Sequence, residues 1–504
     1  MTVLVVWMET TAIINVNQAH MDYNGTTTEP EFRYRQRRIQ HWDRVSKAKA
    51  DANRPGAYYH LLLARFYRFL IPPGKSVLEL GCGHGDLLAA LHPKLGVGID
   101  FSSEMLKTAA AKYSQLHFVR GDAARLPFET TFDVIILSDL VNDLWDLQAV
   151  LENIRPLCHP GTRIVLNFYN NLWRIPLGIV KRMGKGADTL EQNWFSPHDV
   201  ENLLELAGFE SIKNHARILF PVKLRWLANF SNRFLVHLPV FRWFGLTYFI
   251  VGRPAPDPAA ATTLSGPAVT VLVPARNEAG NIEKILRRVP RMGSRTEIVF
   301  VEGNSTDDTY AVIEKTIPKF PGQNCRLYRQ PGKGKGDAVR CGFEKATGDI
   351  LMILDADLTV PPEDLPRFVN VLTSGKGEFI NGVRLVYPME DKAMRFFNIL
   401  GNKFFSAAFS WLLSQPIKDT LCGTKVLYHQ DYLVIAANRK YFGDFDPFGD
   451  FDLLFGAAKL NLKIAEMPIR YRFRTYGDTN IDRWRHGWIL LKMVLFAARK
   501  IKFI

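Results

Sequence analysis

A linker-like segment divides this chain into two halves that each need a core of their own. Residues 253–268, RPAPDPAAATTLSGPA, are rich in Pro, Ala and Thr and lack hydrophobic periodicity. On each side, strand-like apolar runs alternate with helix-like segments, which predicts α/β sheets with mostly parallel strands. A chain of 504 residues is long enough for two such domains. We expect them over 35–252 and 269–504, after a leader over 1–34 that need not be ordered.

Charge and cysteine content narrow the range of partners. The formal net charge of +14 suits anionic partners such as nucleotides or phospholipid surfaces. The five cysteines are scattered without a CxxC pair, which favours a reducing compartment and argues against a structural zinc site. The sequence lacks an aromatic RNA-binding motif or a zinc-finger pattern, so we expect no nucleic-acid partner.

The C-terminal segment is the best candidate for contact with a membrane. No segment reads as a clean transmembrane helix, but residues 484–504, WRHGWILLKMVLFAARKIKFI, are mostly apolar. Arg485, Lys492 and Arg499 recur every seven residues, which keeps them on one side of a helix. Such an amphipathic helix either lies in a membrane interface or packs on the protein with its charges in water, and the sequence leaves both open.

A glycine-rich turn marks a ligand site in the first half. In SVLELGCGHGDLLAAL, residues 76–91, a strand is followed by Gly81, Gly83 and Gly85 and then by a helix. Glycines at such a turn let the backbone approach a ligand closely. Asp100 ends a second strand about 20 residues later, where an acid can hold a ribose diol. Asp122 follows a third strand.

This series resembles the class I S-adenosylmethionine-dependent methyltransferases over roughly residues 35–252. A nicotinamide-binding domain would show G-x-G-x-x-G, whereas here the glycines stand at every second position. The resemblance implies S-adenosylmethionine as cofactor and assigns its binding to six residues: Glu79, Gly81, Gly83, Gly85, Asp100 and Asp122. After the fourth strand, Asp139, Asn142 and Asp143 either orient the methyl acceptor or cap the next helix.

Two acids end the most apolar strand of the second half. In DILMILDADLT, residues 349–359, the run Ile350–Leu354 leads directly into Asp355 and Asp357. In an extended chain these two carboxylates point to the same side. They either belong to an ordinary turn or hold a hard divalent cation such as Mg²⁺ or Mn²⁺.

The neighbouring motifs resemble glycosyltransferase family 2 over about residues 269–485, closest to its polyprenyl-phosphate members. The motifs are Pro-x-x-Asn-Glu, an acidic S-T-D turn, G-K-G and D-x-D, in that order. The resemblance implies a GT-A α/β sheet and a cation on Asp355 and Asp357 that bridges the donor diphosphate. It assigns nucleotide-sugar binding to Pro274, Arg276, Glu278, Glu302 and Lys335. Glu302 stands where the family usually has the first acid of a D-D-G-S turn, and Gly303 replaces the second acid of that turn.

The acceptor class depends on the remaining charged residues. We assign Arg384, Arg395 and Arg474 to an acceptor phosphate, because a guanidinium stays charged and donates two parallel hydrogen bonds. A phosphate monoester is already anionic near neutral pH and needs no general base. A hydroxyl acceptor would need one, for which Asp450 is the candidate.

The combined expectation is a bifunctional enzyme at the cytoplasmic face of a membrane. One half transfers a sugar, with inversion, from a nucleotide-sugar to polyprenyl phosphate, and the other methylates an unknown acceptor. The alternative is transfer to a hydroxyl of a glycan or glycolipid, with the methyltransferase half serving only as a cofactor-binding module.

Overall fold

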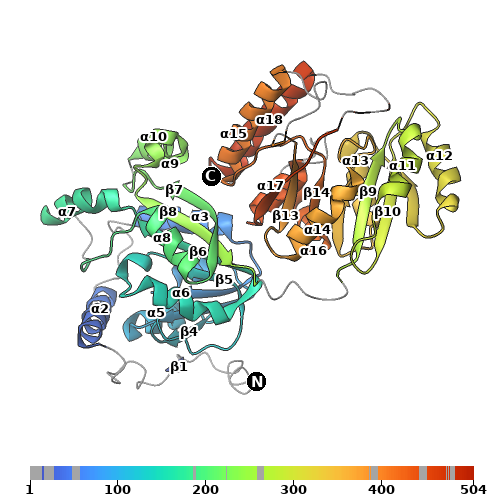
Figure 1. Ribbon diagram of the computed structural model, residues 1–504. Coiled ribbons are helices and arrows are strands. Elements are labelled where there is room, and N and C mark those ends of the chain that lie inside the picture. The colour runs from blue at the N-terminus through green and yellow to red at the C-terminus, as the bar shows by residue number, and fades with distance from the viewer. Residues whose placement is uncertain are drawn as a thin grey trace. The chain divides into compact units, whose positions relative to one another are not determined.

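The chain folds into two compact α/β units, as the alternating strands and helices predict. The computed structural model describes residues 14–15, 28–47, 57–184, 189–222, 224–257, 266–384, 386–387, 396–441, 451–472, 474, 476 and 483–504. The first unit comprises residues 1–255 with residue 504, and the second comprises 256–503. Each unit is built on one sheet with helices on both faces (Figure 1).

The sheet of the first unit has the strand order β1-β4-β3-β2-β5-β6-β8-β7. Neighbouring strands are parallel except around β8, which runs antiparallel to β6 and β7. The order reverses at β2, between β3 and β5, and ligands of open α/β sheets bind at such a switch point. The strands are β1 (Ile14–Asn15), β2 (Ser76–Leu80), β3 (Leu95–Asp100), β4 (His117–Arg120), β5 (Phe132–Leu137), β6 (Cys158–Tyr169), β7 (Phe209–Arg217) and β8 (Thr247–Pro254).

Both faces of this sheet are buried, which explains why its central strands read as continuous apolar runs. On β5, Val134 and Ile136 pack in one core, and Ile135 and Leu137 pack in the other. Helices α3, α4 and α5 supply residues to the first core, and α6 and α8 to the second. The helices of the unit are α2 (Glu29–Lys47), α3 (Ala57–Leu70), α4 (Asp86–Ala90), α5 (Ser103–Lys112), α6 (Leu147–Ile154), α7 (Arg174–Arg182), α8 (Pro197–Leu206), α9 (Arg225–Arg233) and α10 (Pro239–Arg242).

The second unit has the strand order β11-β10-β9-β12-β14-β13-β15. The first four strands are parallel, and β14 runs antiparallel to its neighbours β12 and β13. The strands are β9 (Val269–Ala275), β10 (Thr296–Glu302), β11 (Asn324–Arg329), β12 (Ile350–Ile353), β13 (Phe379–Val383), β14 (Lys425–Tyr428) and β15 (Ile464–Pro468). The helices are α11 (Ile282–Arg288), α12 (Thr309–Thr316), α13 (Lys335–Lys345), α14 (Leu365–Thr373), α15 (Phe396–Leu413), α16 (His429–Ala437), α17 (Phe451–Lys459) and α18 (Arg483–Ile501).

The C-terminal helix α18 contacts α15. Leu490, Met493 and Ala497 of α18 are buried, whereas Trp488 and Leu495 are more than half exposed. Packing on the protein therefore accounts for one face of this helix, and contact with a membrane stays a prediction for the other. Among the described residues, no helix combines the length and apolar character needed to cross a membrane.

Two of the expected domain boundaries fall inside ordered elements, while the expected start of the second domain at residue 269 coincides with the start of β9. Helix α2 begins at Glu29, so the end of the leader expected over 1–34 is helical. Strand β8 continues to Pro254, so the first two residues of the expected linker, 253–268, belong to the sheet. Buried Arg253 pairs with Glu210 of β7, and this ion pair fixes the end of β8.

We expect the two units to unfold independently, because each has its own core. Phe249 is fully buried and packs on Phe66 and Tyr67, with ring centroids 4.6 and 5.3 Å away. The substitution Phe249→Ala should destabilise the first unit by about 3–5 kcal/mol. The matched change Phe343→Ala, at a buried ring 5.0 Å from that of Tyr432, should destabilise only the second. Calorimetry should show two unfolding transitions, of which each variant lowers only one. If either variant lowered both transition temperatures, the two units would not unfold independently.

Candidate functional site

The glycine-rich turn after β2 has the backbone that close approach to a ligand requires. Gly81, Gly83 and Gly85 all have positive φ, of 68°, 52° and 72°. A Cβ atom added to Gly83 would come near only Met105 Sδ, at 3.5 Å, so the space beside this backbone is open. Residues with a side chain rarely adopt this conformation, so glycine is needed for both shape and access.

Asp100, at the end of β3, organises this turn. Its Oδ2 accepts a hydrogen bond from the Gly83 amide at 2.9 Å, and its Oδ1 accepts one from the Ser102 amide at 2.8 Å. Burial raises the pKa of Asp100 to about 6 against the lowering effect of these two amides, and the nearby Asp43 carboxylate of α2 raises it further. Ser102 Oγ donates to Asp43 Oδ1 at 2.5 Å, which ties α2 to this site.

Glu79 is a buried acid on β2 that fits a bound polar ligand. Its side chain is almost fully buried, and burial holds its pKa well above the usual range. Its Oε2 has no hydrogen-bond partner within the protein. An unsatisfied buried oxygen is costly unless a ligand or water pairs with it. Together with the open glycine turn, this oxygen fits the S-adenosylmethionine that the sequence predicts.

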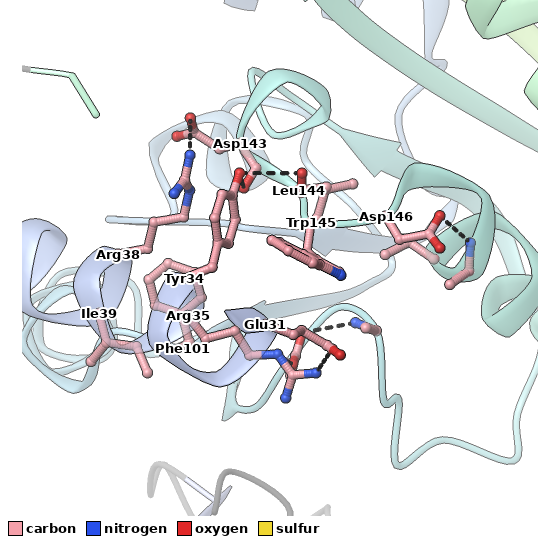
Figure 2. Close-up of a pocket in the computed structure, with 14 residues that line it drawn as sticks. Glu31, Tyr34, Arg35, Arg38, Ile39, Phe101, Asp143, Leu144, Trp145 and Asp146 are labelled. Carbon is pink, nitrogen blue, oxygen red and sulfur yellow. Dashed lines mark hydrogen bonds and ion pairs between the residues drawn. The ribbon is translucent and has the colours of Figure 1, made fainter. Parts of the chain in front are cut away.

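A pocket beside Asp122 is closed by helix α2 (Figure 2). Asp122 Oδ1 accepts from the Ala124 amide at 2.9 Å, and its Oδ2 lies 3.1 Å from Arg35 Nε of α2. Tyr34 Oη of α2 donates to the backbone carbonyls of Asp143 and Leu144, and its ring packs edge-on against Trp145, at 5.1 Å between centroids. No local motif in α2 points to a ligand, so its role at this pocket was not predicted from the sequence.

Asp139 lies in a polar cluster at the end of β5. Its Oδ1 accepts from Tyr59 Oη at 2.7 Å and from Asn167 Nδ2 at 2.6 Å, and its Oδ2 is 4.0 Å from His60 Nδ1. Burial raises the pKa of Asp139. Its φ of 53° is unusual for a residue with a side chain.

The sequence left open whether Asp139, Asn142 and Asp143 cap the next helix. The N-cap of α6 is Asp146, whose side chain accepts from the Ala149 amide at 3.1 Å. Asn142 is buried and bonds to the backbone of Tyr169 and Asn193, which is a structural role. Asp143 lines the pocket of Figure 2 and lies 3.8 Å from Arg38 Nη2, so a role of Asp139 or Asp143 toward an acceptor stays a prediction.

In the second unit, each acid that follows β12 has its own cation. Asp355 Oδ1 lies 2.7 Å from Lys335 Nζ, at the first residue of α13. Asp357 Oδ2 accepts from Arg474 Nη2 at 2.7 Å, and its Oδ1 accepts from Thr359 Oγ1 at 2.8 Å. Burial alone would raise the pKa of Asp355, but the Lys335 ammonium outweighs it and holds this pKa below its usual range.

Arg474 also connects the acids of β12 to the turn after β9. Its Nη1 lies 3.6 Å from Glu278 Oε1, and Glu278 Oε2 accepts from Asn281 Nδ2 at 2.8 Å. Burial raises the pKa of Glu278 to about 7, against the lowering effect of Arg474. Of the predicted donor-binding residues, Glu278 is thus linked to Asp357 through one guanidinium.

The turns after β9 and β10 interlock. Asn277 Oδ1 accepts from the Thr306 amide at 2.8 Å, and Glu302 accepts from the Ser305 amide at 2.5 Å. Pro274 is half-buried in β9 and Arg276 is exposed. Three residues after the parallel strands have positive φ without being glycine, namely Asn277, Asn304 and Leu358, with φ of 58°, 55° and 55°. Such strain is concentrated at functional sites.

Arg384, assigned to the acceptor phosphate, is held by a carboxylate. Its Nε and Nη2 donate to Asp419 at 2.7 and 2.8 Å, and Asp419 is fully buried. Of the other residues assigned to the acceptor, Arg474 lies with the acids of β12, while Arg395 and Asp450 lie outside the described residues.

Three residues of the segment IKDTLCGTKVLYH, residues 417–429, belong to the site without having been predicted from the sequence. Asp419 fixes Arg384, and the fully buried Lys425 donates to the carbonyl of Cys422. A Cβ atom on Gly423 would lie 2.1 Å from Asp355 Oδ2 and 2.4 Å from Lys335 Nζ, so only glycine leaves room for that ion pair.

The donor set fits a divalent cation that also takes ligands from a substrate. Among the described residues, no group of three or more His, Cys, Asp or Glu side chains gathers as a metal site. Two carboxylates, Asp355 and Asp357, are nevertheless enough for Mg²⁺, which usually keeps water and substrate phosphates as its remaining ligands.

Comparisons with known proteins identify both domain types. A family model described as glycosyl transferase family 2 matches residues 270–434, and one described as a methyltransferase domain matches residues 77–161. A dolichol-phosphate mannosyltransferase of Pyrococcus furiosus is 35% identical over 248 residues, which cover 47% of this chain and 67% of the relative.

Two further relatives match over smaller shares of their length. The glycosyltransferase AglD of Haloferax volcanii is 27% identical over 240 residues, 46% of this chain and 37% of the relative. An undecaprenyl-phosphate 4-deoxy-4-formamido-L-arabinose transferase of Pseudomonas syringae is 31% identical over 111 residues, 21% of this chain and 33% of the relative. The chain therefore spans well under two thirds of these two relatives.

Cofactor affinity in the first unit should depend on the ionisation of Asp100. Because the pKa of Asp100 is about 6, its carboxylate gains a proton as the pH falls through 6 and loses acceptor capacity. Affinity for S-adenosylmethionine, measured by calorimetry, should therefore fall below pH 6. Asp43→Asn keeps an acceptor for Ser102 but removes the charge that raises this pKa, so the transition should move to lower pH. If the pH at which affinity falls were the same in Asp43→Asn as in the parent chain, Asp43 would not influence the ionisation of Asp100.

Gly423 should tolerate no side chain. Gly423→Ala would push Asp355 and Lys335 apart and should destabilise the second unit by about 1–3 kcal/mol, measured by denaturant unfolding. Gly401→Ala is the control, because nothing lies within 4 Å of its added Cβ in α15 and alanine favours a helix. Equal stability of the two variants would show that the ion pair can relax.

Proposed function

The chain belongs to glycosyltransferase family 2 and also carries a methyltransferase domain, and from this premise we propose that it transfers a sugar from a nucleotide-sugar donor to a polyprenyl phosphate and methylates a second acceptor. The observation that carries the proposal is the pair of acids at the carboxyl end of β12, each balanced by a separate cation. Ligands of open α/β sheets bind at this edge.

On the donor side, Asp355 and Asp357 would hold Mg²⁺ or Mn²⁺. The cation would neutralise negative charge on the departing nucleotide diphosphate. Lys335 lies 2.7 Å from Asp355 and adds a positive charge beside the diphosphate. Glu278 and the interlocked turns after β9 and β10 would line the nucleoside pocket, as the family resemblance implies.

On the acceptor side, a phosphate monoester is the acceptor class we favour. Two relatives are named as dolichol-phosphate and undecaprenyl-phosphate transferases, which supports this class. Arg474 is the arginine that can serve both sides, because it already bridges Asp357 and Glu278. Once a cation balances Asp357, the guanidinium can turn to an acceptor phosphate. Arg384 acts indirectly, by fixing the chain around Asp419.

In the methyltransferase unit, we assign Asp139 to the methyl acceptor. Its carboxylate is oriented by Tyr59 and Asn167 and lies near His60, an arrangement that can hold a hydroxyl and accept its proton. The second candidate for this unit is a cofactor-binding module without turnover. Transfer of labelled methyl groups to lipid-linked sugars would distinguish the two.

The reaction is tested by a donor screen. The purified chain is incubated with Mn²⁺ or Mg²⁺, a panel of nucleotide-sugars and polyprenyl phosphate, and the products are analysed by mass spectrometry. A polyprenyl phosphate sugar is the expected product. If the sugar were transferred to a hydroxyl of a lipid or glycan instead, the acceptor would be a hydroxyl and not a phosphate monoester.

The acids of β12 should control turnover. Asp357→Asn keeps the size of the side chain but removes a charged cation ligand, and turnover should fall about 100-fold or more, since such an electrostatic contact is worth roughly 3 kcal/mol. Asp349→Asn is the control, because Asp349 lies at the opposite end of the same strand and is exposed. If Asp357→Asn kept full activity with metal present, Asp355 and Asp357 would belong to an ordinary turn and would not hold a catalytic cation.

Arg474 should act on the acceptor rather than on the metal. Arg474→Ala removes the guanidinium that competes for Asp357, so cation affinity should stay equal or rise, while KM for polyprenyl phosphate rises. Steady-state kinetics with each substrate varied in turn measures this difference. If Asp450→Asn abolishes activity and Arg474→Ala has no effect, the acceptor is a hydroxyl.

A further inference from the structure

The first unit exposes large apolar side chains on three of its helices. Ile175 and Ile179 of α7 and Met183, just after its end, follow each other at four-residue spacing and are 53–74% exposed. Trp226 of α9 is 73% exposed and Trp243, just after α10, is 65% exposed. We call the exposed apolar faces of α7, α9 and α10 the apolar surface. Clusters of exposed apolar side chains mark interaction sites.

The three helices belong to one region of the unit. Trp173 Nε1, just before α7, donates to the carbonyl of Phe244 at 2.9 Å. Asn170 Nδ2 donates to the carbonyl of Trp243 at 2.8 Å. Helix α7 follows β6, and α9 and α10 precede β8, which is the neighbour of β6 in the sheet. Figure 1 shows these helices projecting from the body of the unit.

The same segments carry positive charge and no acid. Residues 170–184 and 218–246 contain no Asp or Glu, although the whole chain contains 50. Among their basic residues, Arg174, Lys181 and Arg182 of α7 are exposed, as are Arg233 and Arg242. Apolar and aromatic side chains bordered by Lys and Arg are the composition of helices that lie in a membrane interface.

We propose that the apolar surface docks the methyltransferase unit onto a membrane that contains anionic lipids. The apolar side chains would enter the boundary between headgroups and acyl chains, and the basic residues would pair with lipid phosphates. Helices α7 and α10 have no buried residue within the chain, so little packing inside the protein stabilises them. Isolated helices of this length are marginal in water, and a membrane would cover their apolar faces.

The segments that carry the apolar surface adjoin β6 and β8, whose residues also contact the group around the proposed methyl-acceptor residue. Thr247, the first residue of β8, donates from Oγ1 to Tyr59 Oη at 3.3 Å, and Tyr59 donates to Asp139. Asn167 of β6 donates to the same carboxylate. Resting on the proposed function, these shared strands assign the methyl acceptor to the class of membrane-bound, lipid-linked sugars.

The test is flotation of the full chain with vesicles of phosphatidylcholine, with and without phosphatidylglycerol. The chain should bind the anionic vesicles more tightly than the neutral ones, and added salt should weaken the binding. The double variant Ile175→Asp, Ile179→Asp should bind at least about tenfold more weakly, because it places charges in the apolar boundary. These positions are exposed, so the fold should persist, and unchanged calorimetric affinity for S-adenosylmethionine verifies it.

Two matched variants separate this surface from others. Leu206→Asp, at an exposed position of α8, should leave vesicle binding unchanged. Trp488→Ala, on the exposed face of α18, should reduce vesicle binding less than the double variant Trp226→Ala, Trp243→Ala does. Vesicle binding needs neither sugar nor methyl transfer, so its result is independent of the proposed activities.

Several results would overturn the proposal. One is that the α7 double variant binds vesicles as tightly as the parent chain. Another is that only the Trp488 substitution weakens vesicle binding. A third is that the parent chain binds neutral and anionic vesicles equally, without an effect of salt. Absence of binding by the parent chain would also overturn it. In that case the surface is covered by another part of the chain or by a second copy, which protection from hydrogen exchange and the oligomeric state would distinguish.

Discussion

The pairing of each strand-end carboxylate with its own cation is the interaction on which the second unit's site depends. Asp355 and Asp357 follow the most apolar strand, where two unpaired like charges would repel each other in a partly buried environment. Lys335 and Arg474 balance them one by one. The site is therefore assembled before any ligand binds, and a divalent cation has to compete with these two side chains for their carboxylates.

This arrangement also explains why distant segments meet at β12. Arg474 stands 117 residues after Asp357 in the chain, and Gly423 approaches Asp355 so closely that an added side chain would have to displace the Asp355 carboxylate. Arg384 is in turn held in place by the fully buried Asp419. Breaking a buried ion pair leaves an uncompensated charge, which costs several kcal/mol. Each of these contacts thus restrains the loops around the acids of β12.

Local sequence patterns predicted the strands and the turns, but not which residues pair across the fold. The apolar run at Ile350 and the glycines at 81, 83 and 85 were recognisable because strand burial and positive φ impose composition locally. The role of α2 was not, because a helix rich in Arg and Gln reads as an ordinary solvated helix. Only tertiary contacts reveal that its Asp43 and Arg35 reach Asp100 and Asp122.

The left-handed residues after the strands have a consequence for stability. Asp139, Asn277, Asn304 and Leu358 each adopt a backbone that glycine would adopt with less strain, at a cost of roughly 1 kcal/mol apiece. All four directly follow, or lie close after, the carboxyl end of a parallel strand. Glycine at position 358 would lose a side chain that is buried in the core, and glycine at position 277 would lose the hydrogen bond that Asn277 accepts from the Thr306 amide. The strain is therefore held in place by contacts of the same side chains, so removing it would loosen the turns around the site instead of stabilising the fold.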